Sequence, residues 1–246
     1  MTKHAPILEA SAVHDRRMLS VWLSATFAAG MVNTTTLLAC QRFVTHVTGT
    51  LTLIGSDVMN IVLLLDYGLV TLAFMLGAML SYWLIDGRRV LGKEPWPTVP
   101  LWLVSIVLAV VATMGSFDVY GPFGQTVETN GDFELLVMLA FAMGLQNASI
   151  ATTTGMIVRT THMTGPVTDF SVALAAWLSF APEGIRDTAR ESVMLRGAKI
   201  LFFVFGCAFS ALVAPRLEYN TYFIPAVLIT LAGLRLHNHL VQFKAP

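Results

Sequence analysis

Charged residues are scarce in this chain of 246 residues: they make up 12% of it, against about a quarter in an ordinary soluble domain. Apolar residues make up 55%, against about 45 to 50%. A soluble domain of this size would need a charged surface that this composition does not supply. The sequence therefore predicts a polytopic helical membrane protein. The 15 basic and 15 acidic residues balance, and no long basic cluster occurs, which argues against nucleic acid as a partner.

Cysteine is also rare. Cys40 and Cys207 are the only two, and both lie in or beside apolar stretches, so the sequence offers no disulfide framework and no CxxC metal or redox site. Hydrolase triads, HExxH zinc motifs and phosphate-binding loops are absent as well. We therefore expect no cofactor.

Apolar stretches that could form membrane helices occur eight times. The first four cover 19–39, 49–65, 68–85 and 99–116, and the second four cover 133–151, 165–180, 198–214 and 221–236. The second stretch of each set is short, contains a carboxylate and follows a polar stretch rich in threonine. The chain then divides into two tails, two units and an acidic loop: 1–18, 19–116, 117–132, 133–238 and 239–246.

The two units share a motif at the start of their short stretch. The residues THVTG at 45–49 recur as THMTG at 161–165, and a threonine follows three residues later in each copy, Thr52 and Thr168. Upstream, GMVN at 30–33 recurs as GLQN at 144–147. Repetition of two landmarks in the same order predicts a duplicated unit.

A third landmark lies downstream, in the third stretch of each unit. Small residues four apart let membrane helices approach closely. They occur in both units: Ala73, Gly77 and Ser81 in the first, and Gly206, Ser210 and Ala214 in the second. We match these two sets in that order.

The relative orientation of the units depends on whether 49–65 and 165–180 cross the membrane. Lys and Arg are enriched in cytoplasmic loops. If all eight stretches cross, nine of the 15 basic residues lie inside; if these two dip in and return, only Arg42 and Arg216 remain outside. We therefore predict six full spans and two re-entrant half helices, with both termini cytoplasmic. Three spans per unit make the units antiparallel, an arrangement common among transporters.

In that topology two helix starts face each other near the middle of the membrane. Thr48 and Thr164 suit N-cap positions, Gly49 and Gly165 permit close approach of a ligand, and Pro166 suits a first helical turn. Unpaired N–H groups and the positive end of the helix dipole favour an anionic group there.

Ionisable side chains occur beside both helix starts. His46 and His162 precede them by three residues, while Asp169 lies in the first turn and Asp57 halfway along its stretch. Such groups are costly at membrane depth, so we predict that Asp57 and Asp169 couple the site to protons or ions. The carboxylates compete with a simple anion site. A cation, a zwitterion or proton coupling is equally consistent.

Amides and hydroxyls complete the candidate site, although packing between helices would explain any of them alone. The predicted substrate-binding residues come from both units: Asn33, His46, Thr48, Gly49, Thr52, Gln146, Asn147, His162, Thr164, Gly165 and Thr168. We expect them to line one shared cavity with the two helix starts.

Around these residues the sequence resembles the YoaK-type family of bacterial multi-pass membrane proteins, a family defined by a domain of unknown function. Its patterns G-x-x-D-A and F-V-x-H-M-T-G-N resemble 30–34 and 43–50 here, and M-G-L-Q-N-A and R-T-T-x-x-T-G-T-x-T-D resemble 143–148 and 159–169. Asn33 stands where the family usually has Asp, and Pro166 where it has Thr. The resemblance implies a bacterial cytoplasmic-membrane protein and names no substrate.

Together these features predict an all-α inverted repeat that acts as a small secondary transporter or channel for a polar or charged solute. A membrane-embedded enzyme or metal-binding protein is the alternative, because two His and two Asp at similar depth could hold a metal. The expected partners are the solute, the lipid bilayer and a second copy of the chain, since six short spans leave little protein around a central path.

Overall fold

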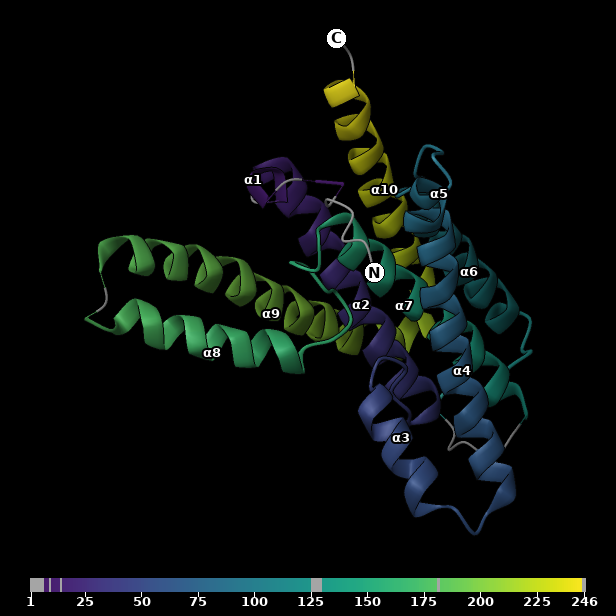
Figure 1. The fold of residues 1–246 in the computed structure, drawn as a ribbon. Coiled ribbons are helices and arrows are strands. Elements are labelled where there is room, and N and C mark those ends of the chain that lie inside the picture. Colours follow the sequence, from purple (N-terminus) through teal and green to yellow (C-terminus); the bar gives the residue numbers. More distant parts are fainter. Residues whose placement is uncertain (1–6, 9, 14, 125–129, 181, 245–246) are drawn as a thin grey trace.

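The computed structural model describes residues 7–8, 10–13, 15–124, 130–180 and 182–244, which form helices and turns and contain no strand (Figure 1). The first half contains α1 (Ala10–Val13), α2 (Arg16–Cys40), α3 (Val47–Ser56), α4 (Ile61–Leu84), α5 (Asp86–Val90) and α6 (Val99–Ser116). The second half contains α7 (Asn130–Thr153), α8 (Thr164–Leu178), α9 (Glu183–Leu217), the 3-10 turn η1 (Glu218–Tyr222) and α10 (Phe223–Lys244).

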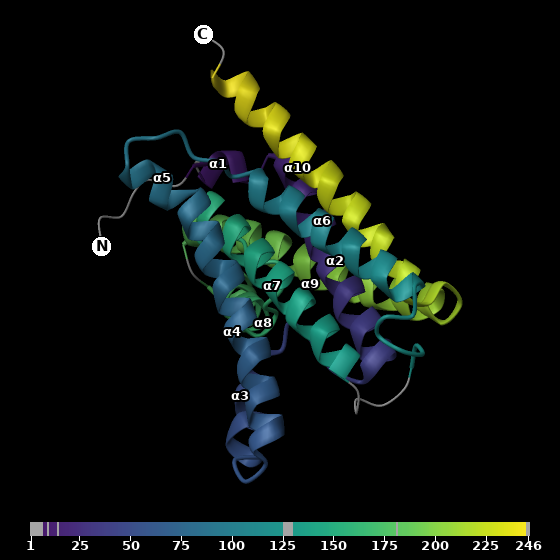
Figure 2. The same cartoon turned by 90° about the vertical axis from the view of Figure 1, so that its right-hand side faces the viewer.

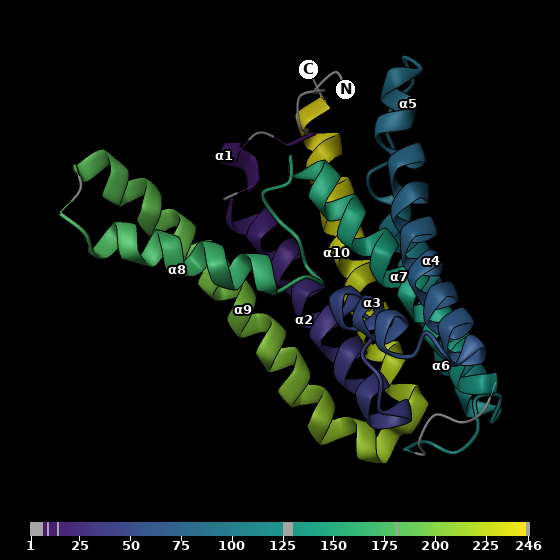
Figure 3. The ribbon, with the colours of Figure 1, turned by 60° about the horizontal axis from the view of Figure 1, so that its bottom comes forward.

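Long apolar helices dominate the fold. Five helical stretches in the described part are long and apolar enough to cross a bilayer: 16–40, 61–90, 99–116, 132–153 and 183–242. The fifth contains both α9 and α10, between which η1 reverses the chain (Figure 3).

The outer faces of these helices are apolar. On α4, for example, Ile61, Leu65, Leu69 and Met75 are each more than half exposed. Apolar surface of this extent is typical of contact with lipid rather than water. The prediction of an all-α polytopic membrane protein is therefore confirmed.

Corresponding helices of the two halves make corresponding contacts. The helix α2 packs along α9 as α7 packs along α4, and α10 lies against α2 as α6 lies against α7. Each half helix contacts the long helix that follows it, α3 with α4 and α8 with α9, while α6 and α10 contact each other (Figure 2). The first long helix of each half thus packs on the second long helix of the other half.

The first helices of the two halves run in opposite directions. The N–H of Leu8, just before α2, donates to the carbonyl of Thr153 at the end of α7. The N–H of Gly124, shortly before α7, donates to the carbonyl of Ala39 near the end of α2. Each bond joins the beginning of one helix to the end of the other, as antiparallel halves require. The bonds support the inverted repeat, which stays a prediction.

Glycines make the crossing of α2 and α9 close. A Cβ on Gly30 would overlap the backbone carbonyl of Phe203, and a Cβ on Gly206 would overlap that of Phe27. Each helix therefore contributes a Phe-x-x-Gly segment whose glycine faces the phenylalanine carbonyl of the other helix. Only glycine allows the two backbones to approach this closely.

The crossing of α4 and α7 repeats this arrangement. A Cβ on Gly77 would overlap the carbonyl of Phe141, and a Cβ on Gly144 would overlap that of Phe74. The structure thus makes Gly77 equivalent to Gly206. The sequence pattern paired Gly77 with Ser210, so the match between the two helices is corrected by one helical turn. The close contact at the glycine, rather than the series of small residues, determines which positions of α4 and α9 correspond.

The first half helix is shorter than the sequence suggested. The apolar stretch 49–65 was expected to form one helix, but α3 ends at Ser56. The side-chain oxygen of Asn60 accepts hydrogen bonds from the N–H groups of Val62 and Leu63 and so begins α4 at Ile61. Residues 61–65 therefore belong to α4, since an N-cap of this kind starts a new helix within an apolar stretch.

Non-helical segments precede both half helices. Gln41 (φ 55°) ends α2 and Gly155 (φ 59°) follows α7, both in the left-handed conformation that commonly ends a helix. Residues 41–46 and 154–163 then lead to α3 and α8, whose hairpins with α4 and α9 project from the bundle (Figure 1).

We predict that Gly77→Ala destabilises the protein in detergent by roughly 1–3 kcal/mol, because its methyl group would overpack the crossing of α4 and α7. Gly68→Ala on the same helix is the control: nothing lies within 4 Å of the added Cβ, and removal of a helical glycine should stabilise by about 0.5–1 kcal/mol. Thermal unfolding measures both, and equal melting temperatures would contradict the close crossing.

Candidate functional site

A pocket of about 480 Å³ lies between the starts of α3 and α8. The first half contributes Asn33, Phe43, Thr45, His46, Val47, Thr48 and Phe74, and the second half contributes Asn147, Arg159, Thr161, His162, Met163, Thr164 and Phe203. Taken in order, each residue of the first set is equivalent to one of the second set, which gives seven pairs. The repeated motif and the spacing from the crossing glycines establish this equivalence. We name this space the central pocket.

The central pocket lies near the middle of the long helices. Asn33 is five residues beyond the midpoint of α2, and Asn147 is similarly placed beyond the midpoint of α7. At 1.5 Å per residue each is about 8 Å past the middle. Because α2 and α7 run in opposite directions, the pocket extends to both sides of the middle of these helices.

The two asparagines have different hydrogen-bond partners. The Oδ1 atom of Asn33 accepts from the N–H of Thr45 at 3.3 Å and from its hydroxyl at 3.1 Å, which ties the segment before α3 to α2. The Oδ1 atom of Asn147 is buried and has no hydrogen-bond partner among the described residues. A buried acceptor without a partner is costly, so Asn147 is available to a polar ligand.

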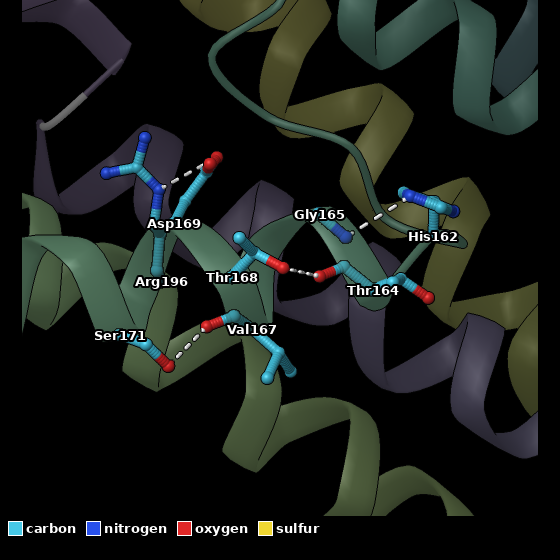
Figure 4. A network of polar contacts seen from close by, with 8 residues as sticks. All are labelled: His162, Thr164, Gly165, Val167, Thr168, Asp169, Ser171 and Arg196. Atoms are coloured by element: carbon cyan, nitrogen blue, oxygen red, sulfur yellow. Dashed lines mark hydrogen bonds and ion pairs between the residues drawn. The ribbon is translucent and has the colours of Figure 1, made fainter.

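The two histidines fold back over the glycines of their motifs. The Nε2 atom of His162 accepts a hydrogen bond of 3.2 Å from the N–H of Gly165 (Figure 4). At the other helix start, a Cβ on Gly49 would lie 3.1 Å from the ring of His46. Glycine at this position leaves room for the imidazole beside the helix start.

This geometry differs from the expected capping by threonine. The residues at the N-cap positions are His46 and Met163, and neither makes a side-chain capping bond, while Thr48 and Thr164 already lie inside the helices. The N–H of Gly165 is occupied by His162, and Pro166 has none. The start of α8 therefore has fewer free donors for an anion than the sequence suggested.

Five predicted residues do not line the central pocket: Gly49, Thr52, Gln146, Gly165 and Thr168. The hydroxyls of Thr52 and Thr168 donate to the carbonyls four residues earlier, at 2.9 and 3.1 Å. Gln146 is fully buried, and its Nε2 atom donates to the carbonyl of Ala25 and the hydroxyl of Thr160. It connects α7 to α2 and to the segment before α8.

Neither carboxylate lines the central pocket. Asp57 follows the last residue of α3, at the opposite end from the pocket. Asp169 is exposed on α8, and its Oδ2 atom lies 3.4 Å from the Nε atom of Arg196 (Figure 4). Coupling to protons or ions through these two groups stays a prediction.

Several lining residues were not predicted from the sequence. Arg159 is the one lining side chain with a permanent charge. Phe74 and Phe203 occupy equivalent positions one turn before crossing glycines, so the shared Phe-x-x-Gly spacing could have indicated them. Phe43 and Arg159 begin the two stretches that resemble the family patterns, so the resemblance could have indicated both.

Groups of metal ligands are absent from the described part of the chain: no three His, Cys, Asp or Glu side chains lie together there in a way that could hold a metal ion. His46 and His162 reach the same pocket, but Asp57 and Asp169 lie elsewhere. The polar lining therefore suits hydrogen bonding to a solute better than metal coordination.

Comparison with known proteins gives one match. A family model described as a protein of unknown function (DUF1275) matches residues 21–234, in agreement with the resemblance noted in the sequence. Neither a curated protein nor a solved structure matches the chain.

We predict that His162→Ala weakens the start of α8 by about 1 kcal/mol, because it removes the acceptor for the N–H of Gly165. Amide hydrogen exchange should become faster in the first turn of α8 and stay unchanged in α7. His162→Asn keeps an acceptor and should lose less protection. Unchanged exchange in His162→Ala would show that the imidazole does not cap the helix.

Proposed function

The chain belongs to the DUF1275 family, whose function is unknown, and we propose that it is a small secondary transporter or channel. Its substrate would be a small polar or charged solute. The observation that carries this proposal is the central pocket, to which both halves contribute equivalent residues near mid-depth. Inverted repeats with broken helices commonly place a substrate site at this level.

The two non-helical segments support the proposal. In hydrocarbon, unpaired backbone N–H and C=O groups are so costly that irregular backbone occurs only where protein or a water-filled cavity surrounds it. Residues 41–46 and 154–163 interrupt the helices, and each segment contributes to the lining of the central pocket. A solvated path at this depth would satisfy their polar groups.

The chemistry of the central pocket suits a small solute. Asn147 offers a buried acceptor without a partner, threonine hydroxyls can donate or accept, and Arg159 supplies a positive charge. Phe74 and Phe203 present apolar rings next to the glycine crossings. In our proposal the halves shift against each other at these crossings and expose the pocket to one side at a time.

We place the protein in the bacterial cytoplasmic membrane with both termini cytoplasmic. The beginning of α9 carries Arg186, Arg190 and Arg196, whereas no Lys or Arg occurs between residues 43 and 87, which include the α3–α4 hairpin. The enrichment of positive residues on the cytoplasmic side supports this orientation. The proposed partners are the bilayer, the solute and a second copy of the chain.

A membrane-embedded enzyme or metal-binding protein is the other candidate. It would need the two histidines and the two aspartates in one place. Asp57 follows the end of α3, and neither it nor Asp169 lines the central pocket with the two histidines, which favours transport over that alternative.

We predict that a cysteine in the central pocket reacts with an aqueous, membrane-impermeant thiol reagent. In a variant with Cys40 and Cys207 replaced by alanine, Thr164→Cys should be labelled, because only water can carry the reagent to this depth and water favours the reactive thiolate. Val172→Cys is the control, since Val172 is 67% exposed on the same helix but lines no described pocket. We expect it to face lipid and stay unlabelled.

An unreactive Thr164→Cys in vesicles of both orientations would contradict a solvated path, and with it both transport and channel activity. Labelling of both cysteines at equal rates would show that α8 lies in water rather than in the bilayer. Mass spectrometry of the intact protein measures the extent of labelling in each case.

A further inference from the structure

A second pocket, of about 270 Å³, lies beside the start of α8. Three cationic side chains line it, Arg159, Arg196 and Lys199, together with one carboxylate, that of Asp169. We name it the α8 pocket. It adjoins the central pocket, because Arg159 and His162 line both.

The lining of the α8 pocket has three cations against one carboxylate, so positive charge is in excess. Asp169 pairs with Arg196 at 3.4 Å (Figure 4). Lys199 is only 2% exposed, lines the pocket, and makes no hydrogen bond or ion pair with any residue that the structure describes. Asp169 attracts Lys199 as well, but it is shared with Arg196. Withdrawal of an ammonium group from water is costly, and a bound anion would lower that cost.

The first half provides an internal comparison. A pocket of about 480 Å³ lies in the equivalent place beside α3. At the positions equivalent to Arg159, Asp169, Arg196 and Lys199 it has Phe43, Leu53, Tyr67 and Val70. One cation, Arg42, also lines that pocket, and it lies over the ring of Tyr67 at 5.3 Å. A half helix therefore packs against the following long helix with one cation instead of three, so packing does not explain the cluster in the second half.

We propose that the α8 pocket binds a small oxyanion, of the phosphate, sulfate or carboxylate class, between Arg159, Arg196 and Lys199. Guanidinium groups bind such anions through two parallel hydrogen bonds, and an ammonium adds a point charge. Asp169 holds Arg196 in place from the exposed side. The group bound is either a free anion or the phosphate of a lipid headgroup, because the two share this chemistry.

Binding of the oxyanion is an equilibrium property that does not require transport. The experiment uses the purified full chain in a neutral detergent and titrates phosphate at constant ionic strength by calorimetry. Lys199→Met removes the ammonium and should lower the affinity for phosphate by about 10- to 100-fold, the loss expected for a hydrogen bond to a charged group. Arg190→Gln, an exposed residue on the same helix that lines no described pocket, should bind as the wild type does.

Thermal unfolding without added anion separates lost binding from misfolding. Lys199→Met removes the charge of a residue that is only 2% exposed, so its melting temperature should equal or exceed that of the wild type. A second arm repeats the unfolding in nanodiscs of phosphatidylcholine with and without phosphatidylglycerol. Stabilisation by phosphatidylglycerol but not by phosphate, lost in Lys199→Met, would assign the site to a lipid headgroup.

Binding of free phosphate that depends on Lys199 would assign the site to a soluble anion. The proposal is overturned if neither phosphate nor phosphatidylglycerol has an effect, or if Lys199→Met responds to them as the wild type does. Neither arm measures flux, so the outcome is separate from that of the transport proposal.

Discussion

The need to satisfy every backbone polar group in hydrocarbon governs the structure of this protein. Two segments of the chain, 41–46 and 154–163, are not helical, and both contribute to the lining of the central pocket. Asn33 holds the segment before α3 through Thr45, and Gln146 contacts Thr160 in the segment before α8. Four glycines at the two helix crossings bring the long helices beside these segments close together. The central pocket is the space that remains between them, and its polar lining follows from the same requirement.

The two halves share a scaffold but differ in charge. The glycine crossings, the left-handed residues after the first helices and the imidazoles over the motif glycines occur in both halves. The side pockets differ: one is lined by apolar and aromatic side chains at the positions where the other has three cations and a carboxylate. The residues at the helix crossings and helix starts thus correspond in the two halves, while the linings of the side pockets differ.

Composition and repetition predicted the membrane class, the long apolar helices and the two helix starts, because these depend on local sequence. Features that depend on tertiary contacts were missed. The sequence did not reveal that one helix ends and another begins before Ile61, because Asn60, which caps the new helix, is a single polar residue within an apolar stretch. The carboxylates of Asp57 and Asp169 were expected in the shared cavity, but the position of each along or around its helix directs it elsewhere. Capping by His162 instead of Thr164 depends on how the imidazole folds over Gly165.

The central claim is that two antiparallel halves meet at mid-depth, and the location of the two hairpin tips tests it most directly. In a variant without Cys40 and Cys207, Met59→Cys and Gly184→Cys place single thiols beyond α3 and α8; Met59 is 95% exposed, and a Cβ on Gly184 meets nothing within 4 Å. We predict that an impermeant reagent labels Met59→Cys from outside intact cells and Gly184→Cys only after the membrane is opened. Labelling of both from the same side would contradict the antiparallel arrangement and the pocket that depends on it.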